Sequence, residues 1–144
     1  MKAMLTSSLG GAFKVNGIRV PDVLIQQNGL LDRLKSIWIP NARVLIICAN
    51  PDNHEKNDGV YACLKEALPM SGLSVSYITQ CDDRNPEIIE SLPEMDVIIL
   101  AGGHVPSQNR FMKQLRLKER LSEFQGILVA WSAGSMNCAE VVYA

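Results

Sequence analysis

Asp96-Val-Ile-Ile-Leu-Ala-Gly-Gly-His104 is the stretch that decides the fold. Its apolar residues are consecutive rather than alternating, as is typical of a strand covered on both faces of a parallel sheet. Arg43-Val-Leu-Ile-Ile-Cys-Ala49 has the same character. Other β-branched and apolar runs predict strands at Lys2–Ser7, Leu73–Thr79 and Ile127–Trp131.

Helix-like segments separate these strands. Apolar residues at helical spacing predict helices over Asp22–Ile37, Asp58–Met70 and Gln108–Phe124, and another helix begins at Ala133. The alternation of strand and helix predicts an α/β fold, a three-layer α/β/α sandwich around a mostly parallel sheet. In such sheets ligands bind outside the carboxyl ends of the strands, where we expect the functional site.

Composition limits the classes of function. The 144 residues suit one α/β domain over 1–144, and a net charge of −1 offers no electrostatic basis for binding nucleic acid. No apolar run reaches membrane-spanning length, and the start of the chain lacks the hydrophobic region of a signal peptide. The four cysteines have no Cys-x-x-Cys spacing, and the two histidines lie far apart. We therefore expect a cytoplasmic protein with reduced thiols, no metal site and no nucleic-acid or membrane partner.

The run Ile127–Trp131 ends abruptly in Ser132, and small residues follow it. On a sharp turn from strand to helix, a serine hydroxyl is exposed with a helix N-terminus behind it. Ser132 is therefore a candidate nucleophile, with the amide of Ala133 as a candidate oxyanion donor. The alternative is a serine that caps the helix, and Ala130 departs from the first glycine of the esterase pattern.

Paired glycines, Gly102 and Gly103, follow the apolar run that ends at Ala101. They allow a tight turn whose backbone amides face a ligand. If this strand neighbours the one that carries Ser132, the Gly103 amide completes a two-donor oxyanion hole. Beyond the turn, His104 and Arg110 are candidate substrate contacts, with a role for His104 as base or in the turn left open. His54 is expected to be a solvated histidine in a polar loop.

Ile98-Ile-Leu-Ala-Gly-Gly-His104 and Leu128-Val-Ala-Trp-Ser-Ala-Gly-Ser-Met-Asn137 together resemble the dipeptidase E (aspartyl dipeptidase) group of serine peptidases, relatives of cyanophycinase. The segments Leu5–Gly11 and Val44–Asn50 are similar to that group's first two strands. The resemblance implies a class I glutamine amidotransferase-like, flavodoxin-like fold. It also implies hydrolysis of a small peptide near an acidic residue, without metal or organic cofactor. By position, Ser132 is then the nucleophile, and Gly103 and Ala133 supply the oxyanion amides.

The chain departs from this group in two ways. His104 stands where members commonly have asparagine, and no histidine follows Ser132, although the group's catalytic histidine and acid lie downstream of the serine. We therefore expect the N-terminal, nucleophile-bearing portion of a longer peptidase-like domain, with its C-terminal part missing and little activity by itself. Two alternatives stay open: a non-catalytic anion-binding module of the same fold, and another acyl hydrolase such as an esterase. A homodimer is also left open.

Overall fold

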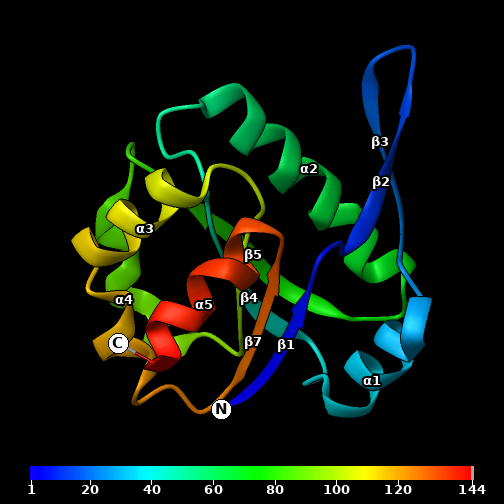
Figure 1. Cartoon of the computed structure of the whole chain (residues 1–144). Helices are drawn as coiled ribbons and strands as arrows, with labels where there is room; N and C mark the ends of the chain where they lie inside the picture. Colours follow the sequence, from blue (N-terminus) through cyan, green and yellow to red (C-terminus); the bar gives the residue numbers. More distant parts are fainter. Residues whose placement is uncertain (144) are drawn as a thin grey trace.

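Five parallel strands form the central sheet of the protein, a computed structural model of which describes the backbone of residues 1–143 and the side chains of residues 1–138. Each neighbouring pair of strands runs parallel, which confirms the predicted α/β class. The strand order is β1-β7-β6-β4-β5 (Figure 1). The bounds are Lys2–Thr6 for β1, Ala42–Ile47 for β4, Val75–Cys81 for β5, Val97–Leu100 for β6 and Ile127–Trp131 for β7.

Helices cover both faces of this sheet, so that the molecule has three layers (Figure 1). Along β4, Val44 and Ile46 belong to one hydrophobic core, whereas Leu45 and Ile47 belong to the other. This alternation is the period of two of a pleated strand, with both faces buried. The first core is closed by α1 (Leu30–Ile37) and α2 (His54–Met70). The second is closed by η2 (Pro86–Glu94), α3 (Val105–Gln114), α4 (Leu117–Leu121) and α5 (Ala133–Tyr143).

The sheet changes direction at β4. From β4 the chain passes through α2 to β5 on one side, and then returns to β6 on the other side of β4. Ligands bind at such switch points in open α/β sheets, outside the carboxyl ends of the strands. The segments that follow β4, β6 and β7 therefore meet at the edge where the sequence predicts the site.

A β-hairpin replaces the first part of the predicted helix Asp22–Ile37, so that this prediction was wrong there. Strands β2 (Gly10–Val15) and β3 (Ile18–Leu24) pair antiparallel, and Figure 1 shows the hairpin extending beyond α2. Its turn is Asn16-Gly17, with φ of 51° and 78°. A two-residue turn with positive φ at both positions matches the twist of a hairpin, which is why Asn-Gly is a strong signal for one.

The predicted helix Gln108–Phe124 is two helices, α3 and α4, because Arg116 has φ 56° between them. The helix predicted to begin at Asp58 begins at His54, where the Asn53 side chain accepts a hydrogen bond from the Lys56 amide. Such a cap satisfies one of the free amides of the first turn, so His54 lies in a helix and not in a loop.

The four cysteines are free and buried. Burial, together with nearby carboxylates, raises the pKa of Cys48 and of Cys81 to about 12. Within residues 1–143, no helix has the combined length and apolar character needed to cross a membrane.

Candidate functional site

Ser132 lies at a sharp turn between β7 and α5, and its backbone has φ 53°. The turn is fixed by two backbone hydrogen bonds, from Ser132 N to Thr6 O and from Met136 N to Ser132 O, each 3.0 Å. A helix-capping serine normally has extended dihedral angles, whereas Ser132 is left-handed and exposed. A strained residue held at a sheet edge is a feature of functional sites, so this geometry favours the nucleophile elbow over the cap.

Ser135 and Gly134 hold the elbow in place: the small size of Gly134 was expected from the sequence, whereas Ser135 was not a candidate. The Ser135 hydroxyl lies 2.7 Å from Thr6 O and 2.9 Å from Ala130 O, and it accepts a hydrogen bond from Thr6 N. A Cβ at Gly134 would lie 2.8 Å from the carbonyl carbon of Leu100. The start of α5 is therefore tied to β1 and pressed against β6, which leaves the Ser132 turn little freedom.

The paired glycines lie directly against the elbow, because β6 and β7 are neighbours in the sheet. A Cβ at Gly102 would lie 2.5 Å from Trp131 Nε1 and 3.1 Å from Ser132 Cβ. Gly103 is exposed, and its N–H donates no hydrogen bond to another described residue. That amide is thus open to a ligand atom. Ala133 is buried, so its role as the second oxyanion donor stays a prediction.

A pocket of about 370 Å³ opens beside Ser132. Three cationic side chains line it: Lys14 and Arg19 from the hairpin, and Lys56 from the first turn of α2. None of the described residues that line it is acidic. These cations were not predicted as site residues, because the hairpin was not predicted and because Lys56 is distant from Ser132 in the chain. The Asn16-Gly17 dipeptide was the signal that could have identified the hairpin.

His104 and Arg110, the two predicted substrate contacts, do not line this pocket. His104 caps α3: its Nδ1 lies 2.6 Å from Ser107 Oγ and accepts a hydrogen bond from Ser107 N. Arg110 lines a separate pocket with Asp83 and Phe111. The imidazole of His104 is therefore engaged within its own helix, and a contact of either residue with substrate remains a prediction.

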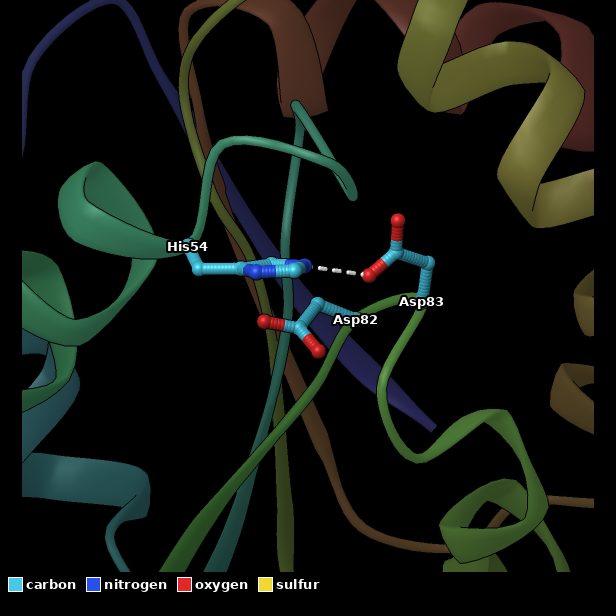
Figure 2. A group of neighbouring side chains, drawn as sticks. All are labelled: His54, Asp82 and Asp83. Atoms are coloured by element: carbon cyan, nitrogen blue, oxygen red, sulfur yellow. Dashed lines mark hydrogen bonds and ion pairs between the residues drawn. The ribbon is translucent and has the colours of Figure 1, made fainter.

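A second group of polar side chains contains His54, Asp82 and Asp83 (Figure 2). His54 Nε2 lies 2.5 Å from Asp83 Oδ1, and one ligand-type atom from each residue falls within 4.8 Å of the others. Asp82, however, is 1% exposed and is bound through both oxygens by Arg84. Burial favours the protonated form of Asp82, but hydrogen bonds from Arg84 outweigh it and hold the pKa of this carboxyl below its usual value.

The Arg84 guanidinium makes this group a poor cation site. Arg84 and Asn57 already occupy the lone pairs of the Asp82 carboxylate. A metal ion would also be repelled by the positive charge of Arg84, whose Nη2 lies 2.6 Å from Asp82. The arrangement is an ion-pair network that ties the loop after β5 to α2, and the pocket beside Ser132 is the stronger candidate site.

In comparisons with known proteins, no family model matches this chain, and no curated protein is significantly similar to it. The function of the site is therefore inferred from its own geometry and chemistry.

Proposed function

We propose that this protein carries the nucleophile of a cytoplasmic serine hydrolase of the dipeptidase E type, which cleaves small peptides near an acidic residue. The observation that carries the proposal is the left-handed turn at Ser132, packed against Gly102 at the carboxyl edge of a parallel sheet. An exposed hydroxyl on a strained turn beside an open backbone amide suits attack on a carbonyl carbon. The four free cysteines are in keeping with a reducing compartment.

In this mechanism Ser132 Oγ attacks the carbonyl carbon of the scissile peptide and loses its proton to a base. The amides of Gly103 and Ala133 stabilise the tetrahedral oxyanion, and the C–N bond then breaks as the leaving amine takes up the proton. Water releases the acyl group from Ser132 in a second attack. Neither histidine of the chain is among the residues described as lining the pocket.

The charge of the pocket supports an acidic substrate. Lys14, Arg19 and Lys56 line it without an acidic neighbour among the lining residues. Cationic side chains around one concave site raise the local concentration of anionic ligands and orient them. A carboxylate on the substrate would bind these groups while its peptide bond lies over Ser132.

A serine-directed fluorophosphonate tests the proposal on the full-length protein in its natural form. We expect one adduct, mapped by mass spectrometry to Ser132, and parallel loss of hydrolysis of aspartyl dipeptides. The Ser132→Ala variant should lose both. Ser122→Ala is the matched control, because the Ser122 hydroxyl is exposed and bonds only to Glu119 O at 2.6 Å. Hydrolysis that persists without a Ser132 adduct would contradict the assignment.

A non-catalytic anion-binding module is the second candidate, favoured by a cationic pocket that neither histidine lines. In such a module, small anions bind at the pocket and Ser132 performs no chemistry. Titration of Ser132→Ala with an acidic dipeptide separates the two functions. Wild-type affinity together with an unreactive Ser132 in the natural protein would favour the module.

A further inference from the structure

Asn50, at the carboxyl end of β4, makes hydrogen bonds to two other segments. Its Oδ1 accepts from the His104 amide at 3.2 Å and from Lys56 Nζ at 3.3 Å. Its carbonyl oxygen accepts from Asn57 Nδ2 at 2.9 Å and from Asn53 N at 3.0 Å. Asn50 is thus held from the α2 side while its side chain holds the segment after β6.

Lys56 contacts the Gly102-Gly103-His104 turn at Gly102, whereas Asn50 contacts it at His104. Its Nζ lies 3.5 Å from Gly102 O, so Lys56 and Asn50 together bind the residues on either side of Gly103. The Gly102 carbonyl and the Gly103 N–H belong to one trans peptide plane and point in opposite directions. Holding the carbonyl therefore also sets the direction of the N–H.

This restraint matters because the turn consists of two successive glycines. Glycine has access to far more backbone conformations than other residues, and a rotated peptide plane would replace the Gly103 donor with an acceptor. Side-chain bulk cannot restrict the turn, since a Cβ at Gly103 would lie 2.7 Å from Ala49 Cβ and 2.9 Å from Lys56 Nζ. The conformation of the turn is therefore set from outside, by Asn50 and Lys56.

The charge of Lys56 is also available at the pocket. Its two hydrogen-bond acceptors, Asn50 Oδ1 and Gly102 O, are neutral, and Lys56 lines the Ser132 pocket. Lys56 is half-buried and forms no salt bridge with a described carboxylate, so its ammonium group contributes positive potential to the pocket. Negative charge that develops near Gly103 would be stabilised by this potential.

We propose that Asn50 and Lys56 are positioning residues that hold the Gly102-Gly103-His104 turn so that the Gly103 amide can act as an oxyanion donor. The inference rests on the proposed hydrolase function. It adds that the side-chain amide of Asn50 and the ammonium group of Lys56 are both needed to hold the turn. A misplacement of about 1 Å at a reacting group can cost about 100-fold in rate. Loss of the Asn50 acceptor should therefore lower kcat more than it changes KM.

The test compares Asn50→Ala, Asn50→Asp and Lys56→Met in the full-length protein, with Lys65→Met as control on the exposed side of the same helix. The measurements are kcat and KM for an aspartyl dipeptide, the rate of fluorophosphonate reaction at Ser132, and Tm. We expect Asn50→Ala to lower kcat and the labelling rate about 100-fold at nearly unchanged KM. Asn50→Asp keeps the acceptor but cancels the Lys56 charge, so its loss should be smaller. Lys56→Met should lower kcat and raise KM, and Lys65→Met should match the wild type.

Wild-type kcat and labelling rate in Asn50→Ala would overturn the positioning role while leaving the hydrolase function intact. If Asn50→Ala is unfolded at the assay temperature, Asn50→Asp and Lys56→Met decide, and wild-type rates in both would overturn it equally. A wild-type protein that neither labels at Ser132 nor turns over substrate would remove the hydrolase function itself, and the positioning role with it.

Discussion

At the scale of single residues, Ser132 shows how this sheet edge stores strain. A non-glycine residue in the left-handed region costs about 1–2 kcal/mol. Two hydrogen bonds hold Ser132 in this conformation. Its amide donates to Thr6 O, and its carbonyl oxygen accepts from Met136 N in the first turn of α5. The turn directs the side chain outward, where it is exposed at the pocket. With a negative φ, the Ser132 side chain would point in a different direction.

Ser132→Gly should therefore stabilise the protein while abolishing labelling by fluorophosphonate. Relief of about 1–2 kcal/mol of strain is partly offset by about 0.5–1 kcal/mol of added unfolded-state entropy, leaving a gain of about 0.5–1 kcal/mol. Urea denaturation measures the free energy of unfolding. Ser122→Gly is the control, because Ser122 has φ −61° and should lose stability on the same change. Equal losses in the two variants would mean that Ser132 carries no strain.

At the scale of elements, the site depends on how closely α5 approaches β6. Gly134, in the first turn of α5, leaves no room for a side chain beside Leu100. The next residue, Ser135, joins α5 to β1, because its hydroxyl forms hydrogen bonds with both the amide and the carbonyl oxygen of Thr6. The start of α5, the edge strand β1 and the buried strand β6 are therefore in direct contact, which positions Ser132 relative to the glycine turn.

Gly134→Ala should destabilise the fold by about 1–3 kcal/mol, because an added methyl group has to displace the Leu100 backbone. The same change should also slow fluorophosphonate labelling, since the elbow shifts with α5. Gly59→Ala in α2 is the matched control: apart from its chain neighbours and the nearby helix backbone, no described atom lies within 4 Å of its Cβ position. It should gain up to about 1 kcal/mol from helix propensity. Thermal denaturation of both variants, together with the labelling rate, checks this prediction. Retention of wild-type stability in Gly134→Ala would contradict the close approach.

At the scale of the whole molecule, burial in two continuous cores controls the chemistry of the thiols. Cys48 and Cys81 lie at the ends of neighbouring strands, and burial raises the pKa of each from 9.0 to about 12. Above pH 9 the unfolded chain releases these protons while the native state retains them. Stability should therefore fall as pH rises from about 9 towards 12.

Urea unfolding at pH 8, 9 and 10 tests this dependence. In the wild type, the free energy of unfolding should change little between pH 8 and 9 and fall more steeply between pH 9 and 10. The fall should be smaller when both Cys48 and Cys81 are replaced by alanine. Reaction of native thiols with a disulfide reagent at pH 8 should be slow, because the reactive thiolate is scarce and all four cysteines are buried. An unchanged pH slope in the double variant would assign the effect to other groups.

The buried strands could be predicted from the sequence, whereas the hairpin and several site residues were not. The buried strands β4, β6 and β7 were predictable because consecutive apolar residues have few alternatives to a position between two helix layers. The hairpin was missed because the apolar residues around Asp22 also fit a helical period, and the Asn16-Gly17 turn was overlooked. Asn50, Lys56 and Arg19 gave no signal as site residues, because their relation to Ser132 exists only after segments distant in sequence have packed together.

The α/β class, and the location of Ser132 and the glycine pair at one edge of the sheet, follow from the sequence alone. Local apolar patterns are sufficient for this, since parallel strands place their carboxyl ends on the same side. Only the tertiary structure decided that Ser132 is left-handed, that the hairpin lines its pocket with cations, and that Asn50 and Lys56 hold the turn. These features depend on strand order and on side-chain hydrogen bonds between distant segments, for which no local sequence pattern exists.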